Sequence, residues 1–230
     1  MIFTLCNTGT INISMLIEYI PTFKYFSMFH TFTKNQEILD FGSNCGNFLK
    51  SNPNVIPLHH YTGIDVDMQA VEEGRKLFPE SNWIWYNRKN PAYNPTGQSV
   101  LPNIDQNFDI VVSYSVFSHT SVDDTLELLE YLYSKLNYGG KILFSYCDVE
   151  NQRCVDWFRK RRVNPDQIPV SDYVYLVENK VAYAEPNTAC EFFVTFYRGQ
   201  WLEEKLQKFN PKRNPAPAPW IQDCITLTKN

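Results

Sequence analysis

The sequence predicts an α/β protein built on a mostly parallel sheet, and three observations support this prediction. Short apolar runs that suit buried strands alternate along the chain with longer runs of helical periodicity. The run at 108–117 is rich in β-branched and apolar residues, as strands buried on both faces of a parallel sheet are. The run at 37–41 leads directly into a turn that contains two glycines. Strands and helices in this order favour right-handed crossovers in one sheet.

The first 150 residues contain a regular succession of elements. In chain order we expect strands at 37–41, 61–66 and 82–87, with a helix at 68–78 before the third of them, then a strand at 108–117, a helix at 122–136 and a strand at 141–147. Asp67 is expected to be the plain N-cap of the first helix, and Pro79 follows its end. The stretch 88–107, rich in Pro, Asn and Gly, is predicted to be a loop, and Gly139 and Gly140 to end the second helix.

The two ends of the chain are less regular. After residue 147 the pattern predicts strands at 173–177, 180–184 and 191–197, a last helix at 198–206, a proline-stiffened link at 210–219 and a closing strand at 220–229. Residues 1–36 are apolar and aromatic, but they lack the basic start of a signal peptide and about 18 uninterrupted apolar residues. We therefore expect residues 1–36 to form a helical flank or lid.

Composition excludes several classes of function. The 21 Lys and Arg against 25 Asp and Glu give a net charge of −4, which does not indicate nucleic acid or an anionic membrane as a partner. The six cysteines stand far apart without a CxxC pair, which favours reduced thiols in a cytoplasmic protein and predicts no metal site. Cys147 and Cys154, seven residues apart, could share a helix face, although a pair of buried thiols is the favoured interpretation. The basic run 159–162 is typical of a solvated helix face.

The stretch EILDFGSNCGNFL (37–49) predicts a ligand site. In doubly wound sheets a ligand lies beyond the carboxyl ends of the strands, and Gly42 and Gly46 remove side chains from that place. Asp40 ends the first strand and could hold an ammonium group. Asp65 ends the next strand, and a carboxylate that accepts two hydroxyl hydrogen bonds is the usual partner of a ribose. Two acids beside two glycines favour this reading over simple capping of turns.

Four segments together resemble one protein family. The segment 38–48 resembles the first motif of the class I S-adenosylmethionine-dependent methyltransferases, which has an acidic residue, any residue, Gly, and a turn to a second Gly. The segment 61–67 resembles the second motif, 108–120 the fourth-strand motif, and 136–145 the helix end and strand that follow. These matches cover residues 37–146. The rival NAD-binding interpretation needs G-x-G-x-x-G, which the turn does not contain.

The resemblance implies a Rossmann-like, seven-stranded, mostly parallel sheet flanked by helices, which binds S-adenosyl-L-methionine across the tips of its first four strands. The cofactor-binding positions that it implies are Asp40, Gly42, Ser43, Asn44, Gly46, Asp65, Val66, Asn87 and Ser113. Among them, Asp65 would bind the ribose hydroxyls, Val66 would pack against adenine, and Ser113 would lie beside the sulfonium. Asn44 replaces a common glycine and Asn87 a common acid, but asparagine tolerates left-handed backbone and its amide can still bond adenine.

The resemblance also divides the chain and suggests one reacting side chain. It implies a cofactor-binding half at 37–146 and an acceptor-side half at 147–230, which together form the methyltransferase domain after the flank. His119, just past the fourth strand, would lie near the methyl-transfer face, where an imidazole could act as a general base. A histidine that only orients the loop by hydrogen bonding is an equal alternative.

The function that follows is methyl transfer to an oxygen, nitrogen or carbon nucleophile of a small molecule, with S-adenosyl-L-homocysteine as the second product. The alternative is a non-catalytic homologue that binds the same cofactor and serves as a partner or regulatory subunit. Nucleic-acid acceptors are disfavoured, because the fourth strand lacks a D/N-P-P-Y signature and no basic surface with interleaved aromatics is visible. We expect no membrane association, and the sequence leaves a homodimer open.

Overall fold

The computed structural model of the chain describes residues 21–90, 93–161, 174–176, 181–184 and 194–230. Its strands are β1 (Ile38–Phe41), β2 (Tyr61–Asp65), β3 (Asn82–Trp85), β4 (Phe108–Ser113), β5 (Leu136–Asp148), β6 (Val174–Leu176), β7 (Val181–Ala184), β8 (Val194–Tyr197), β9 (Pro211–Asn214) and β10 (Asp223–Thr228). Its α-helices are α1 (Thr22–Phe26), α2 (Asn47–Ser51), α3 (Met68–Leu77), α4 (Val122–Ser134), α5 (Gln152–Arg161) and α6 (Gly199–Lys205). Short 3-10 turns lie at Leu58–His60, Phe117–His119 and Gln207–Phe209.

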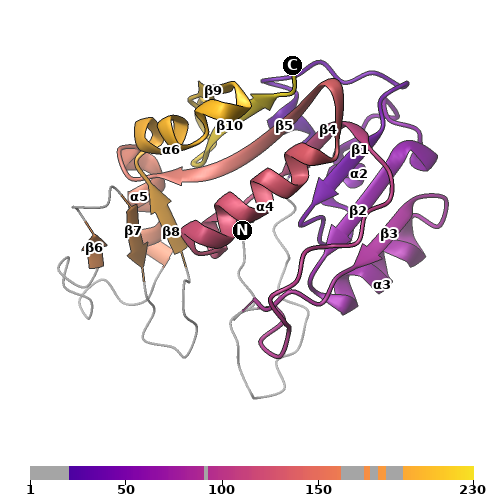
Figure 1. Ribbon diagram of the computed structural model, residues 1–230, viewed down its shortest axis with the longest axis horizontal. Helices are drawn as coiled ribbons and strands as arrows, with labels where there is room; N and C mark the ends of the chain where they lie inside the picture. Colours follow the sequence, from indigo (N-terminus) through magenta and orange to yellow (C-terminus); the bar gives the residue numbers. More distant parts are fainter. Residues whose placement is uncertain (1–20, 91–92, 162–173, 177–180, 185–193) are drawn as a thin grey trace.

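The described strands form one connected sheet (Figure 1). Along its main path the order is β3-β2-β1-β4-β5-β8-β7-β6, and β10 joins β5 to β9. All pairs from β3 to β5 are parallel, as is β5 with β8, whereas β10 and β7 run antiparallel to their neighbours. The reversal of strand order at β1 and β4 is the topological switch point at which doubly wound sheets bind ligands. The predicted α/β class is confirmed.

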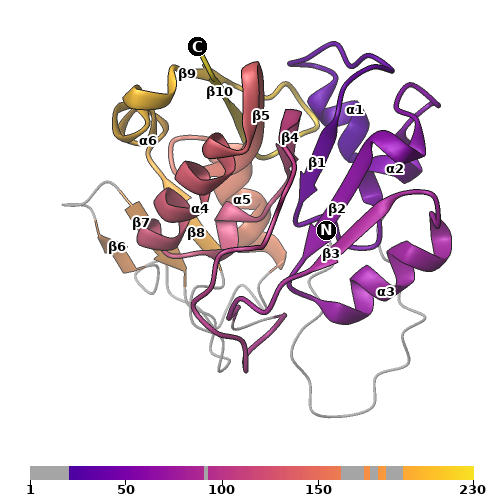
Figure 2. The same ribbon diagram turned by 45° about the vertical axis from the view of Figure 1, so that its right-hand side comes forward.

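Helices cover both faces of this sheet (Figure 2). On one face α1, α2 and α3 pack with the strands around a core that includes Phe26, Phe48 and Val71. On the other face α4 and α6 pack around a core that includes Leu129 and Leu202. Each strand of the first half therefore buries side chains on both faces, which explains its continuous apolar sequence.

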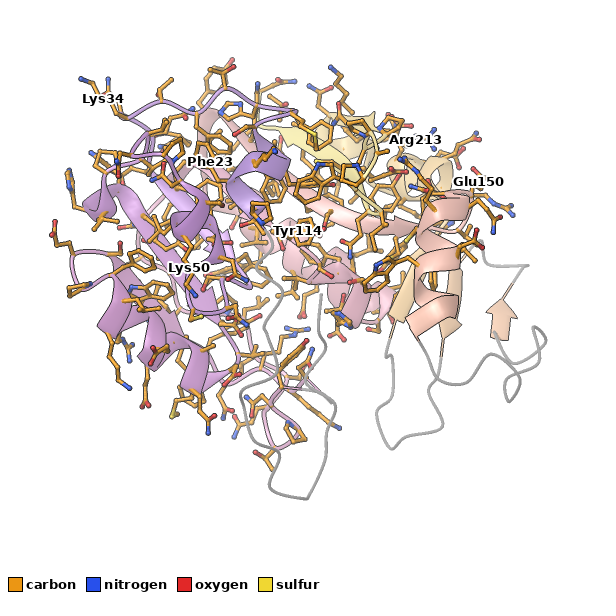
Figure 3. The ribbon with its side chains drawn as sticks, turned by 180° about the vertical axis from the view of Figure 1, so that it is seen from behind. Phe23, Lys34, Lys50, Tyr114, Glu150 and Arg213 are labelled. Atoms are coloured by element: carbon orange, nitrogen blue, oxygen red, sulfur yellow. The ribbon has the colours of Figure 1, made fainter. Side chains whose placement is uncertain are left out.

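The α1 segment is part of the first of these two cores. Tyr25 and Phe26 are fully buried, and the Tyr25 ring meets the Tyr114 ring edge-on at 4.8 Å. Figure 3 shows Phe23 and Tyr114 on this face of the molecule. Within the predicted flank, residues 22–26 are helical and pack against the sheet, and residues 1–20 lie outside the described part of the chain. Within the described residues, no helix has the length and the apolar character needed to cross a membrane.

The sheet is larger than the seven strands that the resemblance implies. Ten strands are described, because the hairpin of β6 and β7 extends the sheet beyond β8 and because β9 pairs with β10. The prediction of a link without secondary structure at 210–219 is wrong for β9. Pro211 opens that strand, and β9 lies at the edge of the sheet, where a residue without an N–H group is tolerated.

Two strand boundaries also differ from the predicted ones, and the hypothesis that two cysteines share a helix face is wrong. Strand β5 begins at Leu136, directly after α4, so the pair Gly139 and Gly140 lies inside the strand and does not end the helix. Strand β4 ends at Ser113, where the pattern predicts four more strand residues. Cys147 and Cys154 share no helix face, since one lies in β5 and the other in α5, but both thiols are buried as favoured.

Candidate functional site

The first part of the site is the turn that follows β1. Gly42 and Gly46 have φ angles of +78° and +88°, which glycine adopts without steric cost. The N–H groups of Gly42 and Ser43 both donate to the carbonyl oxygen of Ile64, at 2.8 and 3.1 Å. The turn is therefore fixed by main-chain bonds to β2, and α2 begins directly after it, at Asn47.

The two glycines are needed for packing, which differs from the sequence argument that they leave room for a ligand. A Cβ atom on Gly42 would lie 2.1 Å from Cγ2 of Val116. A Cβ atom on Gly46 would lie 2.9 Å from the Phe78 ring and 3.1 Å from the Trp83 indole. Sequence reasoning missed Val116 and Trp83, because both contacts come from elements that are distant along the chain.

Asp65 ends β2 and lies against this turn. One of its carboxylate oxygens accepts a hydrogen bond from the N–H of Asn44 at 2.8 Å, and the other accepts one from the N–H of Asp67 at 2.9 Å. A carboxylate offers roughly four lone-pair directions, so about two remain for a ligand. Burial raises the pKa of Asp65 to about 6, although the two N–H donors act in the opposite direction. Asp65 is a half-buried acceptor held in a fixed orientation.

Asp40 occupies the strand tip next to Asp65, and its surroundings are different. Its carboxylate is 6% exposed and accepts a hydrogen bond from the Tyr61 hydroxyl at 2.7 Å. Burial raises the pKa of Asp40 to about 7, the Tyr61 hydrogen bond lowers it, and the charge of Asp65 raises it. In the ladder Asp40 pairs with Gly63 on one side and Val112 on the other. The structure thus brings the two predicted acids together, and Tyr61 is a partner that sequence reasoning missed.

The remaining residues predicted around the nucleotide lie at the same edge of the sheet. Asn44 has a φ of +50°, which fits the expectation that asparagine replaces a glycine there. Ser43 is buried, and Val66 is half-buried and packs against the core beneath α4. Asn87 follows β3 by two residues, and its side-chain oxygen accepts a hydrogen bond from Asn94 at 3.0 Å. Asp67 caps α3 by accepting from the N–H groups at 69 and 70, so the predicted N-cap is confirmed.

The second part of the site is the turn that follows β4. Ser113 is fully buried, and its hydroxyl has no hydrogen-bond partner among the described residues. Ser115 has a φ of +61°, which is rare for a serine. His119 is 9% exposed and closes the 3-10 turn, where its N–H donates to the Val116 carbonyl at 2.8 Å. Since Val116 also packs on Gly42, the two turns meet, and an unpaired hydroxyl lies at the end of β4.

Comparison with known proteins agrees with this architecture. Residues 39–142 match a family model described as a methyltransferase domain. The chain is 29% identical to malonyl-[acyl-carrier protein] O-methyltransferase 1 of Ilyobacter polytropus over 119 residues, which cover 50% of this chain and 40% of that protein. The chain therefore matches less than half of the length of this curated relative.

Solved structures are similar over most of the chain. A protein of Pyrococcus horikoshii OT3 is similar with a TM-score of 0.59 and 11% identity, covering 94% of this chain and 93% of that one. The glycopeptide N-methyltransferase MtfA, solved with S-adenosyl-L-homocysteine, is similar with the same TM-score and identity, covering 91% and 89%. At such identities the likeness shows the fold. Residues 39–142 are thus similar to a methyltransferase domain, and the chain has the fold of these solved structures.

Proposed function

We propose that the chain binds S-adenosyl-L-methionine at the carboxyl ends of β1, β2 and β4 and transfers its methyl group to an oxygen, nitrogen or carbon nucleophile of a small molecule. The observation that carries the proposal is Asp65. Its carboxylate ends β2, is oriented by two main-chain N–H groups, and keeps acceptor capacity for a pair of hydroxyls. Asn44 lies in the glycine turn and donates its main-chain N–H to this carboxylate, so one ligand would contact both the carboxylate and the turn.

The residues present fit this cofactor. The ribose hydroxyls would donate to Asp65, and Val66 and Asn87 would flank the adenine at the ends of β2 and β3. The methionine part would lie along the turn that contains Gly42 and Gly46. The unpaired hydroxyl of Ser113 supports a polar group at the end of β4, because a buried hydroxyl without a partner costs free energy until a ligand bonds it.

S-adenosyl-L-methionine, when bound, supplies a methyl group that its sulfonium makes electrophilic. The contribution of the chain is to orient the ligand through Asp65, to hold the acceptor in line, and to exclude water. His119 is placed by the 3-10 turn beside the same edge and would accept a proton from a protonated acceptor or orient it. The acceptor-side half at 147–230 would supply the rest of the acceptor site.

The acceptor class follows from charge and from the relatives. A net charge of −4 does not favour nucleic acid. The Ilyobacter relative is named for O-methylation of a malonyl group on a carrier protein, and the structurally similar MtfA for N-methylation of a glycopeptide. Both names support an acceptor of the small-molecule type, and a malonyl thioester is the first acceptor to test.

The test is methyl transfer from S-adenosyl-L-methionine labelled in its methyl group to a panel of carboxylic acids, amines, phenols and activated carbons, with the malonyl thioester included. We expect label in one acceptor class and equimolar S-adenosyl-L-homocysteine. Asp65→Ala should lower the rate at limiting methyl donor, and the matched variant Asp67→Ala should not. Tight binding of the methyl donor without transfer to any acceptor would support the non-catalytic alternative, and no binding by folded protein would contradict both.

A further inference from the structure

The turn after β4 is held by a group of buried polar side chains that the proposed function does not use. The N–H of Ser115 donates to the hydroxyl of Ser145 in β5, at 2.7 Å. Ser145 in turn donates to the side-chain oxygen of Gln222 at 2.5 Å, and the side-chain nitrogen of Gln222 donates to the Ser115 hydroxyl at 2.8 Å. The ring of hydrogen bonds starts and ends on Ser115, and Gln222 closes it.

Three more hydrogen bonds extend this ring. The Ser115 and Ser118 hydroxyls lie 3.0 Å apart, and Ser118 donates to the Ser115 carbonyl at 3.0 Å. The main-chain carbonyl oxygen of Gln222 accepts a hydrogen bond from the Tyr25 hydroxyl of α1 at 3.0 Å. Gln222, Ser118 and Ser145 are each 0% exposed. Buried amides and hydroxyls are costly unless paired, so these bonds act as a specific and rigid constraint.

These hydrogen bonds act on Ser115, whose backbone conformation is unfavourable without them. Ser115 has a φ of +61°, a conformation that L-residues other than asparagine and aspartate adopt only when their surroundings impose it. The next residue, Val116, packs on Gly42, at the place where a Cβ on that glycine would collide with it. The conformation of Ser115 therefore decides where Val116 meets the glycine turn.

We infer that Gln222 is a positioning residue of the cofactor site: by holding Ser115 in the left-handed conformation, it seats Val116 on Gly42 and joins the turn after β4 to the turn after β1. The inference rests on the proposed function for its effect on ligand binding. Gln222 directly precedes β10 and lies 107 residues from Ser115 along the chain, so the closing strand of the sheet contributes to a site at the tips of its first strands.

The inference is tested with Gln222→Leu, which keeps the volume of the side chain and removes its hydrogen bonds. The matched control is Gln200→Leu on α6, where the side chain is exposed and donates a hydrogen bond to Glu204 one turn away. A second variant combines Gln222→Leu with Ser115→Gly, because glycine adopts a φ of +61° without the ring of hydrogen bonds.

The first measurement is amide hydrogen exchange of peptides that cover 113–121, with the α3 peptide 68–77 as the internal reference. We expect about tenfold faster exchange in 113–121 for Gln222→Leu, no change in the reference, and no change anywhere for Gln200→Leu. An unchanged rate in 113–121, or an equal increase in both peptides, would overturn the inference.

The second measurement is the calorimetric affinity for S-adenosyl-L-homocysteine. We expect about fivefold weaker binding by Gln222→Leu, which is on the scale of one lost hydrogen bond, and recovery in the double variant with Ser115→Gly. Wild-type affinity in Gln222→Leu, or failure of Ser115→Gly to restore it, would overturn the positioning role. If wild-type protein binds no S-adenosyl-L-homocysteine, the proposed function fails, and the exchange measurement alone decides whether Gln222 holds the turn.

Discussion

Two turns meet at the candidate site, and they are built in different ways. The turn after β1 consists of glycines at positive φ, and main-chain N–H groups fix it to Ile64 and Asp65 of the next strand. The turn after β4 has a serine at positive φ, and side-chain bonds to residues 30 and 107 positions away fix it. The residue types of the first turn allow its backbone conformation by themselves. The conformation of the second turn depends on side chains that come together only in the folded core.

This difference predicts which kind of substitution disrupts each turn. A glycine turn is broken by adding atoms, because its conformation and its close contacts both exclude a Cβ. A turn held by side-chain bonds is broken by removing atoms, because donors and acceptors are then left buried without partners. Variants of both kinds, each with a matched control, test this contrast.

The largest effect is expected for Gly42→Ala. The added Cβ would lie 2.1 Å from Val116 and would also be strained at a φ of +78°, so the free energy of unfolding should fall by about 3 kcal/mol. Gly139→Ala is the matched control, since its φ is +77° and a Cβ there would meet nothing within 4 Å. Urea unfolding should show a loss of only about 1 kcal/mol for that control. Equal losses in the two variants would mean that the contact with Val116 is unimportant.

Asp65→Ala should weaken binding of S-adenosyl-L-homocysteine by about 2 kcal/mol, because the ribose hydroxyls lose their acceptor. Asp67→Ala removes a side chain that caps α3, so it should cost about 1 kcal/mol of stability and leave the affinity unchanged. Calorimetric titration of both variants separates ligand binding from folding. An unaltered affinity in Asp65→Ala would remove this residue from the site.

Ser145→Ala should lower the free energy of unfolding by about 1.5 kcal/mol, because the N–H of Ser115 and the side-chain oxygen of Gln222 lose their partner inside the protein. Ser134→Ala removes an exposed hydroxyl that donates to the Tyr131 carbonyl in its own helix, so it should be nearly neutral. Urea unfolding of both variants provides the comparison. A neutral Ser145→Ala would show that the turn after β4 holds itself, like the turn after β1.

Binding of S-adenosyl-L-homocysteine should weaken as the pH falls through about 6. The pKa of Asp65 is raised to about 6 by burial, with Asp40 and Asp67 nearby, so the free protein takes up a proton there below that pH. Hydroxyl donors on the ligand favour the ionised carboxylate, and protonation therefore opposes binding, by at most about tenfold per pH unit. Calorimetry between pH 5 and pH 8 should show this slope in wild-type protein and a flatter one in Asp65→Asn. The same slope in both would assign the proton to another group.

The smallest effect is expected for Asn44→Gly. Glycine accepts a φ of +50° more readily than asparagine, while the exposed hydrogen bond that the Asn44 side-chain oxygen accepts from the N–H of Cys45 is lost, so stability should change by no more than about 0.5 kcal/mol. The bond to Asp65 comes from the main chain and is kept. The affinity for S-adenosyl-L-homocysteine should therefore match wild type, and a tenfold loss would show that the asparagine side chain is itself part of the site.

Local sequence was enough to predict the first turn. An apolar run that ends in Asp40, glycines that need positive φ, and a second acid at the end of β2 are all determined by neighbouring residues. Asp67 as the N-cap of α3 was predictable for the same reason, because a cap bonds only within its own turn. The boundaries of β1, β2, α3 and β3 differ from the predicted ones by no more than two residues.

The second turn could not be predicted, because its partners come together only in the folded sheet. Nothing in the sequence near Ser115 indicates a positive φ, and nothing near Gln222 indicates a bond to it. The same reason applies to β9, whose strand character is induced by pairing with β10, and to the early start of β5, where Leu136 pairs with Phe108. Such features depend on long-range pairing, whereas propensity and periodicity describe short windows.

The most direct test of the account is a calorimetric titration of the purified chain with S-adenosyl-L-methionine and S-adenosyl-L-homocysteine, with NADH as the control ligand. We expect micromolar binding of the first two and none of NADH, since in the proposed function Asp65 and the two turns would form one site for a ribose that carries a sulfur-linked amino acid. Absence of binding by a folded sample, or preference for NADH, would contradict it.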